Sequence, residues 1–240
     1  MPSVTSSSTA AQIAFVQEAL RTAANPEKAA PMQAYMKTDM PFYGVPKPQR
    51  VTIQRAFRSR FLLTTFDEVR DLVEGLWALP HREDKYLALE LALAHAQLAQ
   101  IPQALPLWEQ LVRDGAWWDL VDPVASTLVS PTILKYRAET QAWVERWIDD
   151  ESLWVRRLAL LSHLKHREQT DAELLFAHCL ARAHERDFFI RKAIGWALRE
   201  YSRHAPEAVH TLLVNHRERW SGLTFREASK RLRKEGWSMD

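Results

Sequence analysis

Apolar residues recur three and four positions apart along almost the whole chain, the pattern of amphipathic α-helices. Strand-like alternation is rare, and short breaks rich in proline separate the periodic segments. The clearest of these segments are LALELALAHAQLA (87–99), WVRRLALLSHLKH (154–166), AELLFAHCLARA (172–183) and FIRKAIGWALREY (189–201). The pattern predicts an all-α protein of about a dozen helices, each of roughly ten to eighteen residues.

An internal repeat refines this prediction. Val155, Ile190 and Phe225 lie 35 residues apart, and an arginine follows each of them. A period in the mid-thirties with two helices per unit indicates a HEAT-like α-solenoid, in which one helix of each pair lines a concave surface. We therefore expect a single solenoid domain over residues 9–240 with a concave basic groove. Residues 1–8 are polar and rich in Ser and Thr, so we expect them to form a disordered lead.

The segment AYMKTDMPFYGVPKPQR, residues 34–50, is the main exception to the helical pattern. Its three prolines and Gly44 are incompatible with a continuous helix. Two interpretations stay open at this point. The segment is either a tight connection fixed by Phe42 and Tyr43, or a loop that closes one end of the groove.

Composition limits the classes of function without selecting one. The net charge of the 240-residue chain is only +2, but residues 186–240 contain twelve Lys/Arg against seven Asp/Glu. This local excess suits a polyanion, and it equally suits a solvated helical surface. The N-terminus lacks the pattern of a signal peptide, and no apolar run is long enough for a membrane span. We expect a cytoplasmic protein.

The same composition argues against several chemistries. Cys179, the single cysteine, lies in an apolar helical pattern and is expected in the core. One cysteine permits neither an internal disulfide nor a cysteine-based metal site. The nine histidines show no ligand spacing supported by carboxylates, and no glycine-rich phosphate loop is present. We expect no metal and no cofactor.

The stretch GAWWDLVDP, residues 115–123, concentrates aromatic and acidic residues. Trp118 and Asp122 are four apart and share one helical face, while Trp117 and Val121 share another. This spacing predicts that the second pair packs in the core and the first pair faces outward. Pro123 disfavours helical geometry at Asp122, so an alternative is that Asp122 caps the following helix.

Two further segments combine cations with tryptophan. Arg157 and Lys165 are eight apart, about two helical turns, and Trp154 precedes Arg157 by three positions, where it could lie against the guanidinium. A second stripe follows helical spacing over eleven residues and consists of Lys192, Trp196, Arg199 and Arg203. Cations that alternate with a flat aromatic ring suit a nucleic-acid backbone, although cations on a solvated face are also ordinary.

These segments, in this order, resemble the HEAT-repeat DNA alkylation repair proteins of the AlkD type, which are alkylpurine DNA glycosylases. The motifs that carry the resemblance are YMKTDMPFYGVPKPQR, GAWWDLVD, LWVRRLALLSHLK and FFIRKAIGWALREY, and it extends from about residue 10 to 236. The resemblance implies that Trp118 and Asp122 form the lesion-site pair. It implies that Arg157 is the essential arginine and that Trp196 is the second tryptophan of the site.

The resemblance also implies which residues bind DNA, and the sequence differs from the family at one position. The residues expected to bind DNA are Tyr35, Lys165, Lys192, Arg199 and Arg203. Pro46 stands where the family has a glutamine, and proline offers neither a side-chain donor nor an N–H. A contact to DNA is therefore expected to be missing at Pro46.

The implied activity is excision of cationic N3- or N7-alkylated purines from double-stranded DNA by a monomer, without a deep base-flipping pocket. Asp122 would stabilise an oxocarbenium-like sugar, and the two tryptophans would flank it. Two alternatives are a DNA-binding scaffold with silent or narrowed activity and a HEAT-type module that binds proteins. The cationic stripe argues against the last.

Overall fold

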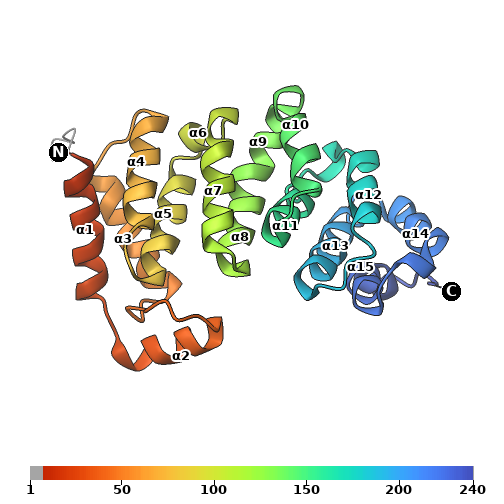
Figure 1. Ribbon diagram of the computed structural model, residues 1–240, viewed down its shortest axis with the longest axis horizontal. Helices are drawn as coiled ribbons and strands as arrows, with labels where there is room; N and C mark the ends of the chain where they lie inside the picture. The colour runs from red at the N-terminus through yellow and green to blue at the C-terminus, as the bar shows by residue number, and fades with distance from the viewer. Residues whose placement is uncertain (1–7, 240) are drawn as a thin grey trace. The chain divides into compact units, whose positions relative to one another are not determined.

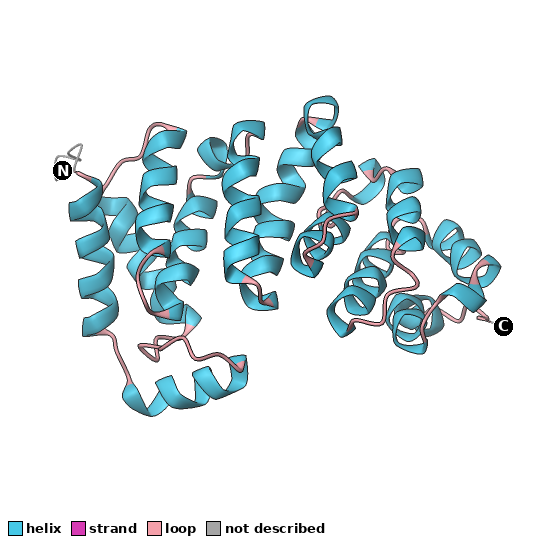
Figure 2. Ribbon diagram, viewed as in Figure 1, coloured by secondary structure: helices cyan, strands magenta, loops and turns pink. Residues whose placement is uncertain are grey.

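The computed structural model describes residues 8–239. Every regular element within this range is a helix, which confirms the all-α prediction (Figures 1 and 2). Most of the predicted disordered lead lies outside the described residues, and Ser8 accepts a hydrogen bond from the Ala11 N–H as the N-cap of the first helix. The chain divides into two compact units, and the boundary in the sequence falls between Ala99 and Gln100. The prediction of a single domain stays a prediction.

The described part of the first unit, residues 8–99, contains six helices and their connections. Their bounds are α1 Thr9–Thr22, α2 Pro26–Met36, α3 Lys47–Arg60, α4 Phe66–Trp77, α5 Arg82–Ala94 and α6 Ala96–Ala99. The best-formed start is that of α4, where Thr65 and Glu68 cap each other's backbone N–H groups in a capping box. Helix α2 buries none of its residues, so its position depends on the connections at its two ends.

The proline-rich connection between α2 and α3 is held by a buried carboxylate. Glu83, fully buried at the start of α5, accepts hydrogen bonds from the backbone N–H groups of Tyr43, Gly44 and Val45 at 3.0, 2.9 and 2.9 Å. Gly44 has φ +81°, and a Cβ there would lie 2.0 Å from the Asn25 carbonyl oxygen. The connection is therefore fixed tightly to its own unit, as the first of the two interpretations expects. In addition to the buried aromatic side chains, it is held by the three hydrogen bonds to Glu83, which we call the clasp.

The second unit contains the remaining helices. Their bounds are α7 Leu105–Gly115, α8 Trp118–Pro123, α9 Ser130–Lys135, α10 Arg137–Ile148, α11 Leu153–Leu161, α12 Ala172–Ala181, α13 Phe188–Tyr201, α14 Pro206–Asn215 and α15 Gly222–Lys234. Short 3₁₀ turns lie at 102–104, 167–169 and 217–219. In the part of the chain that the structure describes, none of the helices is both long and apolar enough to cross a bilayer.

The 35-residue repeat corresponds to the packing of this unit. Val155, Ile190 and Phe225 lie near the starts of α11, α13 and α15, and all three are buried. Helix α11 packs against α13, and α13 packs against α15. The intervening helices α12 and α14 complete the pairs. The repeat thus marks successive helices of the same kind, as an α-solenoid requires.

Helix α8 continues without a break through a π-helical turn, Val124–Val129, into α9. Pro123 and Pro131 lie inside this helical stretch, and each lacks the N–H that would normally bond the carbonyl four residues earlier. The carbonyl of Thr127 instead accepts a hydrogen bond from the Gln100 side chain at 2.7 Å. Because the backbone is helical at Asp122, the alternative in which Asp122 caps a following helix is wrong.

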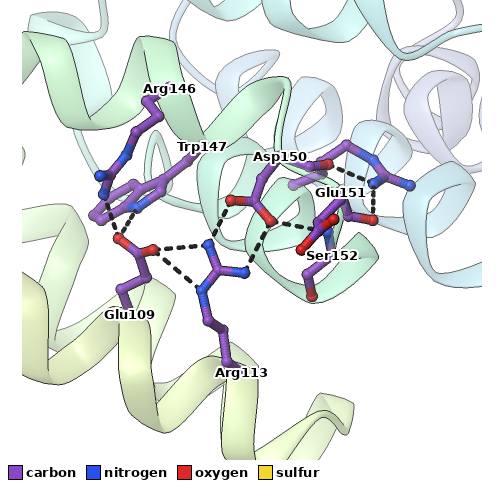
Figure 3. A network of polar contacts seen from close by, with 8 residues as sticks. Glu109, Arg113, Arg146, Trp147, Asp150, Glu151 and Ser152 are labelled. Atoms are coloured by element: carbon purple, nitrogen blue, oxygen red, sulfur yellow. Dashed lines mark hydrogen bonds and ion pairs between the residues drawn. The ribbon is translucent and has the colours of Figure 1, made fainter.

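A polar network fixes α7 against α10 and the start of α11. Arg113 lies between Glu109 and Asp150 and bonds both carboxylates (Figure 3). The other oxygen of Glu109 accepts the Trp147 indole N–H at 2.8 Å, and Asp150 accepts the Ser152 N–H at 2.8 Å where α11 begins. The network therefore sets the position of α11 relative to α7. Because α8 begins three residues after the end of α7, the network also helps to place α8 relative to α11.

Candidate functional site

A pocket of about 390 Å³ lies in the second unit, between side chains of α8, α11, α13 and α15. Its lining consists of Trp118, Asp122, Arg157, Phe188, Phe189, Lys192, Trp196, Arg199 and Glu227. Six of these nine residues are sites expected from the sequence. The structure thus brings the expected acid, both expected tryptophans and three expected cations to one pocket. The outermost of these six residues, Trp118 and Arg199, are 81 positions apart in the sequence.

Asp122 and Arg157 both line this pocket and form a bidentate ion pair. The Nε and one terminal nitrogen of Arg157 donate to the two carboxylate oxygens of Asp122, each at 2.7 Å. The other terminal nitrogen donates to the Phe189 carbonyl at 2.6 Å. The Arg157 side chain is 6% exposed and that of Asp122 is 15% exposed. The carboxylate is therefore the more accessible partner, and the arginine holds it in a fixed orientation.

The surroundings shift the acid–base behaviour of this carboxyl group. Burial raises the pKa of Asp122 above its ordinary value, and the hydrogen bonds and charge of Arg157 act in the opposite direction. Both oxygens of Asp122 accept a hydrogen bond from the guanidinium, and this bidentate geometry is typical of an ionised carboxylate rather than a carboxylic acid. Each carboxylate oxygen keeps a lone pair that Arg157 does not use, so the group can still act on a positive centre in the pocket.

Three aromatic side chains form an aromatic wall next to Arg157. Trp117, Trp154 and Phe189 pack together with ring centroids 5.8, 5.3 and 4.8 Å apart. Val121 is fully buried, whereas Trp117 is half-buried and is the extended N-cap residue before α8. The core position is therefore confirmed for Val121 and only in part for Trp117, while Trp118 and Asp122 line the pocket as the spacing predicted. The ring near the Arg157 guanidinium is Phe189, at 5.9 Å, whereas the sequence suggested Trp154.

Elsewhere in the pocket lining, two cations share one carboxylate. The Lys192 ammonium lies 3.1 Å from a Glu227 oxygen, and a terminal nitrogen of Arg199 lies 2.8 Å from the same oxygen. Burial raises the pKa of Glu227, but the bonds and charges of Lys192 and then Arg199 outweigh this, and the net shift is downward. Glu227 is therefore a carboxylate, and the cationic stripe is partly neutralised where it meets the pocket.

Two of the expected DNA-binding cations lie beyond the ends of their helices. Helix α11 ends at Leu161, and Lys165 has φ +68°, so Lys165 does not share a helical face with Arg157. Helix α13 ends at Tyr201, so Arg203 lies in the following turn and pairs with Glu200 at 3.1 Å. Neither residue lines the pocket. Helical spacing was extrapolated too far in both cases, because the sequence there contains no strong stop signal.

Tyr35 belongs to the first unit, near the end of α2, and is 71% exposed. Its predicted contact with DNA stays a prediction. Pro46 is the N-cap residue of α3 and makes no side-chain capping bond. The expected loss of a contact to DNA at Pro46 stays a prediction.

Three lining residues, Glu227, Phe188 and Phe189, were not expected from the sequence. Glu227 could have been found from the repeat, because Asp122, Arg157, Lys192 and Glu227 follow one another at intervals of 35 residues. Phe188 is 52% exposed although it is a large apolar residue. An apolar pattern alone assigns such a residue to the core, so no signal in the sequence marked it as part of the pocket lining.

The buried histidines form a separate cluster. His163 Nε2 lies 3.2 Å from His178 Nδ1, and burial lowers the pKa of His163 well below its ordinary value. Within residues 8–239, no group of three or more His, Cys, Asp or Glu side chains has the arrangement of a metal site. Cys179 is fully buried, as expected for a core thiol.

Comparison with known proteins gives the family. Residues 16–232 match the model of a family described as "DNA alkylation repair enzyme". A solved structure described as "Predicted DNA alkylation repair enzyme from Enterococcus faecalis" is similar, with a TM-score of 0.73 and 31% identity over 88% of this chain and 97% of that one. No curated protein matches the chain significantly. The chain therefore belongs to the DNA alkylation repair enzyme family.

Proposed function

We propose that the protein is a DNA glycosylase that excises cationic N3- or N7-alkylated purines from double-stranded DNA. The observation that carries the proposal is the Asp122 carboxylate, which is held by Arg157 in a pocket that Trp118 and Trp196 also line. Membership of a DNA alkylation repair family supports DNA as the substrate.

The chemistry requires little proton transfer. Alkylation at N3 or N7 makes the purine cationic, so the base is already a good leaving group. Positive charge then develops on the deoxyribose as the glycosidic bond breaks. A fixed carboxylate beside that sugar stabilises the developing charge, and a preorganised electrostatic partner of this kind contributes about 3 kcal/mol or more. Asp122 fits this role, directly or by positioning the water that attacks the sugar.

The other residues of the lining would bind and orient the nucleotide. The electron-rich faces of Trp118 and Trp196 attract a cationic sugar by about 1–2 kcal/mol each when water is excluded. Lys192 and Arg199 would hold the phosphate next to the lesion and set the register of the strand. Arg157 is buried, and each of its three nitrogens already donates to Asp122 or to the Phe189 carbonyl, so its role would be to fix the carboxylate rather than to bind phosphate.

The proposal is tested by release of N7- or N3-methylpurine from a defined duplex by the wild type and Asp122→Asn. We expect the wild type to release the base and the variant to be slower by a factor of about 100 to 1,000, the usual cost of one preorganised electrostatic partner. Asp114→Asn is the matched control, because Asp114 is exposed on α7 and does not line the pocket. It should release the base at the wild-type rate.

The results separate the proposal from its alternative. Equal release by Asp122→Asn and the wild type refutes the role of that carboxylate. Intact duplex binding by the wild type without release of either base would favour a DNA-binding scaffold that has lost turnover. Thermal unfolding of both variants shows whether a change in rate reflects a change in stability.

A further inference from the structure

The four charged residues spaced 35 apart form two ion pairs in the pocket lining. Asp122 on α8 pairs with Arg157 on α11, and Lys192 on α13 pairs with Glu227 on α15. The order of charge along the repeats is therefore negative, positive, positive, negative. Glu227 occupies in the last repeat the position that Asp122 occupies in the first, with two cations between them.

The backbone places Glu227 where it can reach two cations at once. Gly195 lies between Lys192 and Arg199 on α13, and a Cβ at Gly195 would approach the Glu227 Cβ to 2.6 Å and the Thr224 carbonyl oxygen to 3.3 Å. The missing side chain lets α15 come close to α13 at this point. One Glu227 oxygen then bonds Lys192 and Arg199, which lie one turn to either side of Gly195.

The charge of the lining is small as a result. It contains three cations, Arg157, Lys192 and Arg199, and two carboxylates, Asp122 and Glu227, which leaves a net charge of +1. Arg157 is paired with Asp122, so the cations of the lining that are left to contact DNA are Lys192 and Arg199, which both pair with Glu227. Together with Glu227 these two cations also sum to +1, which matches a single phosphate monoanion.

We propose that Glu227 is a positioning residue that acts as a built-in counterion for Lys192 and Arg199, so that this side of the pocket accepts one phosphate instead of two. The inference rests on the proposed function, since it assumes that Lys192 and Arg199 contact the DNA backbone. Glu227 fixes the direction of both cations before DNA arrives, and it cancels one of their two charges. The Glu227 side chain is 18% exposed, so the carboxylate lies at the pocket surface, where a phosphate would meet it.

Salt dependence measures this role directly. Each phosphate that a protein neutralises contributes about −0.9 to the slope of log affinity against log salt concentration. Glu227→Gln removes the counterion and keeps the shape of the side chain, so its slope on an unmodified duplex should be steeper by about 0.9. The affinity of the variant relative to the wild type should then be about 3.5-fold larger at about 50 mM salt than at about 200 mM.

The experiment titrates an unmodified duplex with five forms of the full chain across this salt range. They are the wild type, Glu227→Gln, Glu227→Ala, Glu227→Asp and Glu235→Gln. The alanine variant repeats the loss of charge if glutamine impairs folding, and Glu227→Asp keeps the charge and should keep the wild-type slope. Glu235 pairs with Arg231 at the end of α15, away from the pocket lining, so Glu235→Gln controls for the overall charge of this region.

The outcomes distinguish the inference from a structural ion pair. Steeper slopes confined to Glu227→Gln and Glu227→Ala support the counterion role. Wild-type slopes in both of these variants, or an equal change in Glu235→Gln, overturn it, because an ion pair that only joins α13 to α15 alters stability and leaves the slope unchanged. If the wild type binds no duplex at all, the proposed function itself is refuted. If the wild type binds duplex and the slopes of the Glu227 variants are unchanged, only the counterion role is refuted.

Discussion

Replacing Arg157 by methionine tests the arrangement on which the site depends. The substitution removes the donors of the two 2.7 Å bonds to Asp122 and of the 2.6 Å bond to the Phe189 carbonyl. Methionine keeps a similar apolar volume beside the aromatic wall. The variant therefore leaves a carboxylate with 15% of its side chain exposed and without its cation.

The expected cost follows from the burial of the pair. Removing one partner of a buried ion pair costs about 3–5 kcal/mol, because the remaining charge is left uncompensated. Asp122 lies at the edge of a pocket, so we expect Arg157→Met to lower the free energy of unfolding by about 3 kcal/mol, near the bottom of that range. Asp122→Asn in the same background removes the unpaired charge. The double variant should therefore recover part of the loss, with a coupling energy of about 2 kcal/mol between the two sites.

The assay is urea unfolding of the wild type, both single variants and the double variant, followed by tryptophan fluorescence. Additivity of the two single effects within about 0.5 kcal/mol would refute the claim that the two side chains act as a unit. Duplex binding adds a second readout. If Arg157 is committed to Asp122, Arg157→Met should keep the wild-type salt slope. A slope flattened by about 0.9 would mean that Arg157 contacts a phosphate.

Two further predictions concern the first unit. Burial raises the pKa of Asp84, a fully buried side chain, to about 6. Because its pKa is higher folded than unfolded, stability should fall by up to about 3 kcal/mol as pH rises from about 4 through about 6. Asp84→Asn, which keeps an acceptor for the His81 N–H, should flatten this fall in urea unfolding between about pH 4 and pH 8; an equally steep curve in the variant would rule out Asp84 as the cause. Gly44→Ala should lower the free energy of unfolding by about 2 kcal/mol or more, because φ is +81° and the new Cβ would meet the Asn25 carbonyl oxygen. Gly222→Ala, where a Cβ meets nothing within 4 Å, is its control and should be nearly neutral; equal losses in the two glycine variants would contradict the steric argument.

The sequence was most informative where helical period and repeat period agree. The spacing of Val155, Ile190 and Phe225 identified equivalent buried positions, and all three pack as one kind of helix. The i, i+4 relation of Trp118 and Asp122 predicted a shared face, and both line the pocket. Short-range geometry is fixed by the backbone of a single helix, so it can be read without knowledge of the packing.

Contacts between helices were harder to predict. The reach of Glu227 to Lys192 and Arg199 depends on the close approach of α15 at Gly195, a property of two packed backbones. The pairing of Arg157 with Asp122 likewise depends on how α8 lies against α11, which spacing within one helix does not report. Lys165 and Arg203 were misplaced because helix ends are set by local capping, which the periodicity of apolar residues does not report.

The clasp made by Glu83 has a consequence for how freely the neighbouring connection can vary. Its three bonds go to main-chain N–H groups at 43, 44 and 45, and none goes to a side chain. Position 46 provides none of these donors, so proline there removes no bond from the clasp. The residue at position 46 can thus be exchanged without the loss of any of these bonds, and the carboxylate that holds the connection lies some forty residues downstream, in the first turn of α5.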